Sequence, residues 1–182
     1  MNTTTKRTFS VPQRDEVSVT NQGIFDNLHK MIGFVPNLYA FYAHNDIALS
    51  DYLALQNRKS TLSGKQREVI NLVTSQINGC RYCQSAHSVS GKYAGLSEEQ
   101  ILEVRGGTAS FDPKLDALAR FTAEVVTNRG KVSEDAKELF FQAGYSVANL
   151  IDVVIVVGDK IISNYLHNLT GIEIDWPLAD QL

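Results

Sequence analysis

The sequence has few cysteines and prolines and no excess of basic residues, and each shortage excludes a class of protein. Two cysteines and four prolines among 182 residues are too few for a disulfide-framed secreted domain or a proline-rich linker. The 17 Lys and Arg are outnumbered by 20 Asp and Glu, for a formal net charge of -3. We therefore expect no nucleic-acid partner, because such proteins carry a basic patch.

Long apolar runs are missing as well. The N-terminal segment MNTTTKRTFSVPQRDE has no apolar core of the kind that a signal peptide needs. No later stretch reaches the roughly 18 uncharged apolar residues of a membrane-spanning helix. We expect a cytoplasmic protein that has no membrane partner.

The composition that remains is that of one globular unit. With 43% apolar residues, a chain of this length builds a core without a disulfide or a metal. There is no internal repeat or low-complexity tract that would divide it. We expect residues 1–20 to form a mobile N-terminal arm, and residues 21–182 to form a single helical domain with a C-terminal tail.

Helix start and stop signals recur along the chain and predict an all-α fold. Apolar residues repeat at three and four positions, and strict alternation is scarce. The expected starts are at Ser63, Ser97, Asp112, Ser133 and Ser146, and the expected ends are at Gly79, Gly95, Gly130 and Gly171. The run from Val153 to Val157 has the β-branched composition of a strand, but no turn signal lies between Ser146 and Asn168. One long helix, in a core or a subunit interface, is therefore predicted there.

The two cysteines form the most informative motif. Cys80, Cys83 and His87 are spaced i, i+3 and i+7, which places all three on one face of a helix. The break at Asn78-Gly79 predicts that Cys80 begins this helix, where unpaired N–H groups and the macrodipole favour a thiolate. A hairpin about the same break brings Glu68 of the preceding helix close to His87. The sequence therefore predicts one site made of two thiols, an imidazole and a carboxylate.

These residues resemble the signature of the AhpD-like alkylhydroperoxidases in the carboxymuconolactone decarboxylase superfamily. The signature is a glutamate, eleven residues, a CxxC pair, three residues and a histidine, here Glu68 through Cys80-Arg-Tyr-Cys83 to His87. The resemblance extends to Gly33-Phe-Val-Pro-Asn37 and to Leu169-Thr-Gly-Ile-Glu-Ile-Asp-Trp-Pro177. The sequence is most similar to the branch of peroxidase-related enzymes.

The resemblance implies an activity and a role for each site residue. It implies a homo-oligomer, a trimer or a hexamer, that reduces hydrogen peroxide or organic hydroperoxides with electrons from a thiol or dithiol reductant. Cys83 would attack the peroxide, Cys80 would resolve the sulfenic acid, and His87 with Glu68 would relay protons. This chemistry needs no flavin, haem or metal, because a thiolate, a proton donor and a second thiol suffice. The better-studied relatives have a histidine where this chain has Tyr82.

Several alternatives remain open. The tyrosine at position 82 favours a thiol–disulfide oxidoreductase or carrier without efficient peroxidase activity. A zinc site would use Cys80, Cys83 and His87, but the sequence shows no fourth ligand at a usual spacing. A non-catalytic helical assembly protein and a lactone-acid decarboxylase are further possibilities. Glu68 can also be a surface partner of Lys65, Tyr82 is expected to pack, and Asn164 and His167 are left outside the catalytic set.

Overall fold

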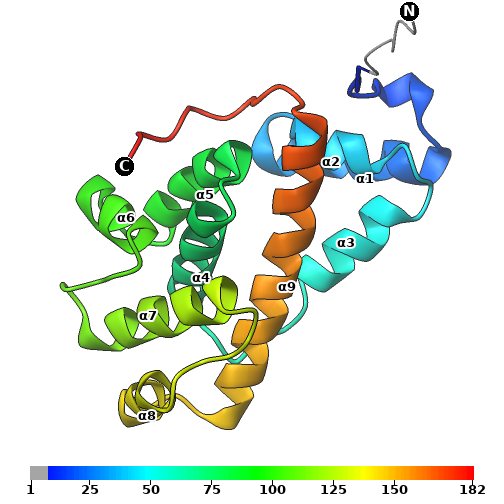
Figure 1. Ribbon diagram of the computed structural model, residues 1–182. Coiled ribbons are helices and arrows are strands. Elements are labelled where there is room, and N and C mark those ends of the chain that lie inside the picture. The colour runs from blue at the N-terminus through cyan, green and yellow to red at the C-terminus, as the bar shows by residue number, and fades with distance from the viewer. Residues whose placement is uncertain (1–7) are drawn as a thin grey trace, which may run out of the picture.

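The computed structural model describes residues 8–182, and this part of the chain contains helices and no strand (Figure 1). The all-α fold predicted from the helix signals is therefore confirmed. The helices are η1 (Arg14–Glu16), α1 (Val19–Ile32), α2 (Asn37–Tyr42), α3 (Ala48–Gln56), α4 (Gly64–Ile77), α5 (Arg81–Tyr93), α6 (Glu98–Arg105), α7 (Pro113–Thr127), α8 (Glu134–Gln142) and α9 (Val147–Thr170).

The expected N-terminal arm lies partly outside the described residues, which begin at position 8. Its later part contains the one-turn helix η1 and the start of α1. Arg14 in η1 forms two hydrogen bonds of 2.7 Å with Asp26 of α1, and Val17 between them is buried. The mobility of the arm and its boundary with the domain stay predictions.

The helix ends follow the capping signals of the sequence. Ser63, Ser97 and Ser146 are N-caps in capping boxes, and Asp112 and Ser133 cap α7 and α8. Gly79 and Gly171 adopt left-handed backbone angles, with φ of 65° and 59°, which a residue with a Cβ rarely adopts. The Gly79 turn matters most, because it reverses the chain between α4 and α5.

The main hydrophobic core surrounds α4. Four of its residues, Val69, Ile70, Leu72 and Val73, are fully buried, and the helix contacts α5, α6, α7 and α9. The seven consecutive residues from Val69 to Ser75 are all buried, so this part of α4 lies inside the bundle. Because α4 is buried between α5 and α9, it holds the side chains of these two helices at fixed positions.

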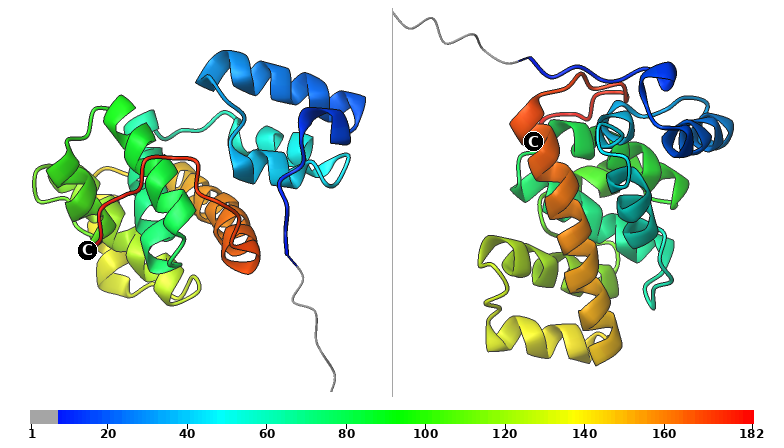
Figure 2. Two further views of the ribbon diagram at one scale, coloured as in Figure 1. Left: turned by 90° about the horizontal axis from the view of Figure 1, so that it is seen from above. Right: turned by 90° about the vertical axis from the view of Figure 1, so that its right-hand side faces the viewer.

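A second hydrophobic cluster joins the N-terminal helices α1 to α3 to the N-terminal end of α5. It contains Phe25, Leu38, Leu49 and Tyr52 from α1 to α3, together with Cys80, Tyr82 and Cys83. Figure 2 shows α1 to α3 as a group beside the remaining helices, with the C-terminal segment crossing near them. The cysteine pair therefore lies where the two groups of helices meet.

The long helix predicted from Ser146 is confirmed as α9, and the run from Val153 to Val157 is helical. Tertiary packing against α4 overrides the strand propensity of the β-branched residues. Within residues 8–182 no single helix is both long and apolar enough to cross a membrane; α8 and α9 meet the two conditions only together, as a pair bent by 117°.

Candidate active site

The hairpin of α4 and α5 brings Glu68 and His87 together, as the sequence predicts. Nδ1 of His87 lies 2.8 Å from Oε2 of Glu68, and the amide of Asn71 donates a 3.0 Å hydrogen bond to Oε1 of the same carboxylate. The two residues are nineteen positions apart in the chain. The turn at Asn78-Gly79 therefore creates this contact, which a continuous helix would not allow.

The two cysteines lie at the first turn of α5. Cys80 is the N-cap, and its sulfur accepts a 3.2 Å hydrogen bond from the backbone N–H of Cys83. The two residues are paired as a disulfide, with their Cα atoms 5.3 Å apart. Cys80 is fully buried and Cys83 is 3% exposed. The N-terminal position favours negative charge on a sulfur that the opening of the disulfide releases.

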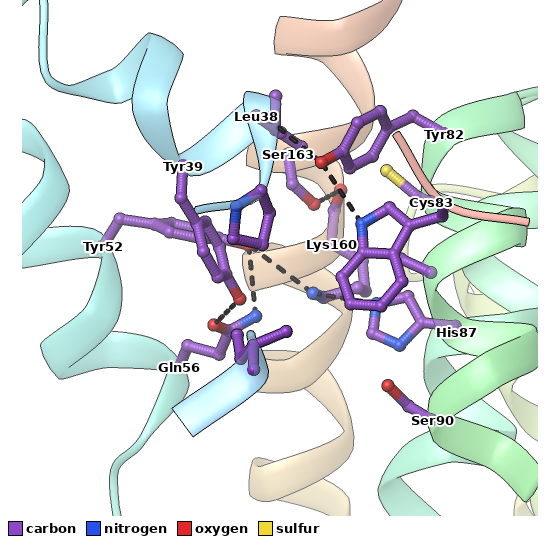
Figure 3. Close-up of a pocket in the computed structure, with 14 residues that line it drawn as sticks. Leu38, Tyr39, Tyr52, Gln56, Tyr82, Cys83, His87, Ser90, Lys160 and Ser163 are labelled. Atoms are coloured by element: carbon purple, nitrogen blue, oxygen red, sulfur yellow. Dashed lines mark hydrogen bonds between the residues drawn. The ribbon is translucent and has the colours of Figure 1, made fainter. Parts of the chain in front are cut away.

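Cys83 and His87 line one cavity of about 140 Å³ between the N-terminal helices, α5 and α9 (Figure 3). Its walls are largely apolar and aromatic, with Leu38 and Tyr39 from α2 and Tyr52 from α3. A cavity near 150 Å³ holds a benzene ring. The site therefore has room for a small ligand, of about one ring, beside the sulfur of Cys83.

His87 also borders a second cleft, of about 260 Å³, on its other side. Polar residues dominate this cleft, which includes Arg67, Glu68, Asn71 and Asp159. The imidazole thus stands between an apolar cavity that contains the sulfur and a polar one. A proton that His87 takes or gives in the first cavity can be exchanged through Glu68 in the second.

The charge state of Glu68 follows from its surroundings. Burial raises the pKa of this carboxyl, but its contacts with His87, the positive charge of Lys160 and the hydrogen bond from the Asn71 amide together lower it below 4.5. Glu68 is therefore an anion near neutral pH and accepts a hydrogen bond from Nδ1–H of His87. Burial also raises the pKa values of Tyr39 and Tyr52, so their hydroxyls stay neutral.

The sequence analysis missed Lys160. Its side chain is 2% exposed, and its Nζ lies 3.3 Å from Nε2 of His87, on the opposite edge of the ring from Glu68. A signal for it exists in the sequence, because Asp159 and Lys160 are adjacent charges inside the otherwise apolar run from Val153 to Ile162. An ionisable pair within a buried apolar helix is expensive and points to a specific role.

Tyr82 holds the C-terminal segment in place. Its hydroxyl donates a 2.7 Å hydrogen bond to Oδ1 of Asp175, and it accepts bonds of 3.2 Å from the N–H of Leu38 and the indole of Trp176. Burial raises the pKa of Tyr82, so the phenol does not exchange protons near neutral pH. Tyr82 is thus buried and hydrogen-bonded, as expected of a packing residue, and its side chain also lines the cavity that contains Cys83.

Asn164 and His167 bond away from the cavity. The amide of Asn164 donates to Oγ of Ser75 and its carbonyl accepts from Asn78. Nε2 of His167 lies 3.1 Å from the carbonyl of Ile172, and burial lowers the pKa of this imidazole. Neither residue lines the cavity that contains Cys83. They join α9 to α4 and to the C-terminal segment.

Within residues 8–182, no group of three or more His, Cys, Asp or Glu side chains is arranged to hold a metal ion. The histidines at 29, 44 and 167, which are far from the motif in the sequence, do not line the cavity either. The three candidate zinc ligands of the motif thus have no fourth partner in the described part of the chain.

Comparison with known proteins gives a family and a fold. Residues 47–124 match the carboxymuconolactone decarboxylase family, and this segment runs from the start of α3 into α7 and includes all four predicted site residues. A comparison with curated protein sequences gives no match.

Solved structures match almost the whole chain. An uncharacterised peroxidase-related protein with an alkylhydroperoxidase AhpD core, from Ralstonia eutropha JMP134, is 21% identical with a TM-score of 0.83, covering 92% of this chain and 91% of that one. A peroxidase-related protein from Silicibacter sp. TM1040 is 23% identical with a TM-score of 0.79, covering 91% and 90%.

A third similar structure is the debrominase Bmp8, in which a cysteine-to-alanine variant is bound to 2,3,4-tribromopyrrole. It is 15% identical with a TM-score of 0.77, and the match covers 94% of this chain and 93% of that one. At these identities the solved structures establish the fold, and the family match adds the segment that carries the CxxC motif. Residues 47–124 are thus similar to the carboxymuconolactone decarboxylase family, and the chain has the fold of the AhpD-like structures.

Proposed function

We propose that the protein is a thiol-dependent peroxidase that reduces hydrogen peroxide or small organic hydroperoxides through Cys83 and Cys80. The observation that carries the proposal is the shared cavity of Cys83 and His87, in which His87 is hydrogen-bonded to Glu68. A thiol needs a base to become a nucleophile, and a departing alkoxide needs an acid. An imidazole backed by a carboxylate serves both needs.

The proposed reaction has two steps on the protein. The Cys83 thiolate attacks one peroxide oxygen, the O–O bond breaks, and the alkoxide leaves as an alcohol after it takes a proton through His87. The thiol of Cys80 then attacks the sulfenic acid of Cys83, and a disulfide and water form. An external dithiol returns the two electrons and two protons. In sum, one hydroperoxide and two thiols give one alcohol, one water and one disulfide.

The burial of the two sulfurs supports the assignment of their roles. Cys83 faces the cavity, and Cys80 is fully buried behind it as the N-cap of α5. A peroxide in the cavity meets the Cys83 sulfur first. Cys80 lies one turn away, as a resolving thiol must.

The size of the cavity supports a preference for small substrates. About 140 Å³ accommodates hydrogen peroxide, a short alkyl hydroperoxide or a single-ring hydroperoxide, by comparison with a benzene-sized cavity. A long lipid chain does not fit inside it. We therefore expect cumene hydroperoxide to be a substrate and a fatty-acid hydroperoxide to be a poor one.

The first experiment measures peroxide-driven disulfide formation. The protein is reduced without oxygen, mixed with one equivalent of hydrogen peroxide or cumene hydroperoxide, and followed by free-thiol titration and intact mass. We expect both thiols to disappear and the mass to fall by two hydrogens. Thiols that stay free for minutes would instead favour the alternative of a disulfide carrier, which exchanges with small disulfides and ignores peroxide.

Single cysteine variants test the two roles. Cys83→Ser is expected to lose peroxide consumption, whereas Cys80→Ser should accumulate a sulfenic acid that dimedone traps. Serine is a good N-cap residue, so Cys80→Ser preserves the start of α5. We expect this variant to fold like the wild type and to serve as the control for Cys83→Ser. A trapped sulfenic acid in Cys83→Ser would reverse the assignment.

A second candidate function is reductive dehalogenation of a small aromatic compound. The aromatic cavity walls and the room for about one ring favour it, and Bmp8, a debrominase of similar fold, binds a single-ring bromopyrrole. Two thiols would supply two electrons and two protons, so that one aryl halide gives one arene, one hydrogen halide and one disulfide. Halide release from a bromopyrrole or bromophenol by the reduced protein tests it, with Cys83→Ser as the control.

A further inference from the structure

The middle of α9 carries a charged pair where a helix of this kind normally has apolar residues. Asp159 and Lys160 are 5% and 2% exposed, and Oδ2 of Asp159 lies 3.5 Å from Nζ of Lys160. Taking charges out of water costs several kcal/mol each unless partners compensate. Two apolar residues would pack α9 against its neighbours at no such cost, so packing alone does not account for the pair.

The contacts of Lys160 connect it to the cysteine site. Besides Asp159, its Nζ lies 3.3 Å from Nε2 of His87 and 3.5 Å from the hydroxyl of Tyr52. Figure 3 shows Lys160 reaching from α9 into the space between the tyrosines of α2 and α3 and the imidazole of α5. Lys160, His87 and Cys83 all line the same cavity.

The hydrogen bonds on either side of His87 fix its proton. The Glu68 carboxylate accepts, so Nδ1 of His87 donates to it. The ammonium of Lys160 has no lone pair, so Nε2 of His87 has to offer one. A doubly protonated ring would set an N–H against an ammonium. The two contacts therefore fit the ring with its proton on Nδ1 and its lone pair on Nε2, which faces the Lys160 ammonium.

The ammonium of Lys160 and the sulfur of Cys83 line the same, largely apolar cavity. Charge–charge interactions are several times stronger in such surroundings than in water, and a nearby lysine stabilises a thiolate. Every element that packs around Cys83 and His87 also carries titratable side chains. They are Tyr39 on α2, Tyr52 on α3, Glu68 on α4, Tyr82 on α5, Asp159 and Lys160 on α9, and Asp175 in the C-terminal segment.

The other groups in this set do not supply positive charge. The tyrosines have raised pKa values and stay neutral. Asp175 accepts hydrogen bonds from Tyr82 and from the N–H of Asn37 and does not line the cavity. Glu68 and Asp159 are carboxylates of the polar cleft. Lys160 is thus the fixed cation on the cavity side.

We propose that Lys160 is a positioning residue whose ammonium holds reduced Cys83 as a thiolate and keeps the Nε2 lone pair of His87 directed into the cavity. This inference rests on the proposed thiol chemistry of Cys83, but it does not depend on peroxide as the oxidant. The net reaction is unchanged: Lys160 keeps its proton, and the proton that the Cys83 thiol loses passes to the Nε2 lone pair of His87 and from there to the departing alkoxide.

The test measures thiolate reactivity without any peroxide. In a Cys80→Ser background, where Cys83 is the only thiol, the rate of alkylation by iodoacetamide is followed against pH by intact mass. Lys160→Met is expected to lower the rate at pH 7 about tenfold and to raise the pH of half-maximal rate by about one unit, the change that follows from losing a neighbouring charge. Lys160→Arg, which keeps the charge, should restore most of the rate.

Two further variants serve as controls. Lys92→Met removes an exposed lysine from the same helix as Cys83, one that pairs with Glu98 on the surface, and it should leave the alkylation profile unchanged. Asp159→Asn with Lys160→Met removes both charges, so no unpaired carboxylate is left buried. If Lys160→Met fails to fold, as circular dichroism shows, the double variant decides, and we expect its profile to shift in the same direction.

The outcomes separate this inference from the proposed function. A folded Lys160→Met or double variant with the wild-type alkylation profile overturns the role of Lys160, whatever the protein does with peroxide. If Lys160→Met shifts the alkylation profile but the wild-type protein does not react with peroxide, the role of Lys160 stands and the peroxidase proposal is wrong. Nitrogen-15 spectra give a second readout: the ring of His87 protonated on Nδ1 alone should dominate in the wild type, and Lys160→Met should add the doubly protonated ring, because no ammonium then faces Nε2.

Discussion

At the scale of single residues, the carboxylate of Glu68 sets what His87 can do. Because its pKa lies below 4.5, Glu68 is ionised throughout the neutral range and orients the imidazole. Glu68→Gln keeps the shape of the side chain and removes the charge. We expect this variant to form the Cys83 sulfenic acid at least about tenfold more slowly at pH 7, because the imidazole that acts as acid and base loses the carboxylate that orients it. Stopped-flow measurement of peroxide consumption gives the rate. An unchanged rate would contradict the relay.

The depressed pKa of Glu68 also links stability to pH. A carboxyl whose pKa is lower in the folded chain stabilises the fold fully above its unfolded value, near 4.5, and loses that contribution as the pH falls through the folded value. Glu68→Gln should therefore reduce the free energy of unfolding at pH 7. The difference from the wild type should shrink below about pH 4.5, in urea titrations at several pH values. A difference that grows on acidification would oppose this sign.

Tyr82 offers a contrasting prediction, because it is adjacent to Cys83 in sequence and yet acts through packing. Tyr82→Phe loses the three hydrogen bonds of the hydroxyl, and we expect it to lower the free energy of unfolding by about 2 kcal/mol. The rate of the peroxide step should stay within about threefold, since the phenol carries no proton in it. A large loss of rate with unchanged stability would give Tyr82 a chemical role.

Much of the site was predictable at this scale, and the reason is its local geometry. The spacing of Cys80, Cys83 and His87 fixes their common helix face, and the Asn78-Gly79 break fixes the hairpin that adds Glu68. Lys160 was not predictable in the same way, because it reaches the site from α9, 73 positions after His87. Only the three-dimensional packing of α9 on α4 and α5 decides which side of α9 faces the cavity.

At the scale of helices and loops, the connection between α3 and α4 is held by one carboxylate of α9. Asp152 accepts hydrogen bonds from Arg58, Ser60 and Thr61, all in the loop that leads to Ser63, the N-cap of α4. Burial raises the pKa of Asp152, but these hydrogen bonds outweigh burial and lower it far below 3.8. The loop is thereby held against α9.

Asp152→Asn is expected to lower the free energy of unfolding by about 3 kcal/mol at pH 7, because it leaves Arg58 without its counter-ion. On acidification, Asp152 is protonated in the unfolded chain before it is protonated in the folded one. The difference in the free energy of unfolding between the variant and the wild type should therefore persist down to about pH 3.8. It should narrow at lower pH. Urea titration of both proteins measures it, and a difference below about 0.5 kcal/mol at pH 7 would mean that the loop is held otherwise.

The helices themselves were largely predictable, and the cavity was not. Capping residues and glycines are local signals, so the starts of α4, α6, α7, α8 and α9 agree with the sequence. The cavity depends on α2, α3 and the C-terminal segment closing over α5. That closure comes from long-range contacts, such as the 2.7 Å bond between Asp175 and the N–H of Asn37, which have no local signature.

At the scale of the whole molecule, α9 presents apolar side chains to solvent along much of its length. They recur at helical spacing and are 46% to 78% exposed: Val147, Ile151, Val154, Ile162, Tyr165 and Leu169. Such a stripe commonly marks an interface. The family resemblance implies a homo-oligomer, and we propose that a second copy of the chain covers this stripe.

Val154→Glu with Tyr165→Glu is expected to shift the protein to a single-chain species in analytical ultracentrifugation. Burying two carboxylates in an apolar interface is strongly unfavourable. Lys131→Glu, an exposed residue of the loop between α7 and α8, is the charge-changing control and should leave the association unchanged. A wild type that sediments as one chain at all concentrations would remove this proposal.

The burial of the disulfide has a kinetic consequence. Cys80 is fully buried, and the sulfur of Cys83 faces a cavity with room for about one ring. In the proposed reaction, the oxidant and the reducing thiol therefore bind at the same place in turn and cannot be bound there together. Steady-state turnover should follow a ping-pong pattern, with parallel double-reciprocal plots. An excess of reductant should also slow turnover, because reductant bound in the cavity of the reduced protein excludes the oxidant. This inhibition should be competitive with the oxidant.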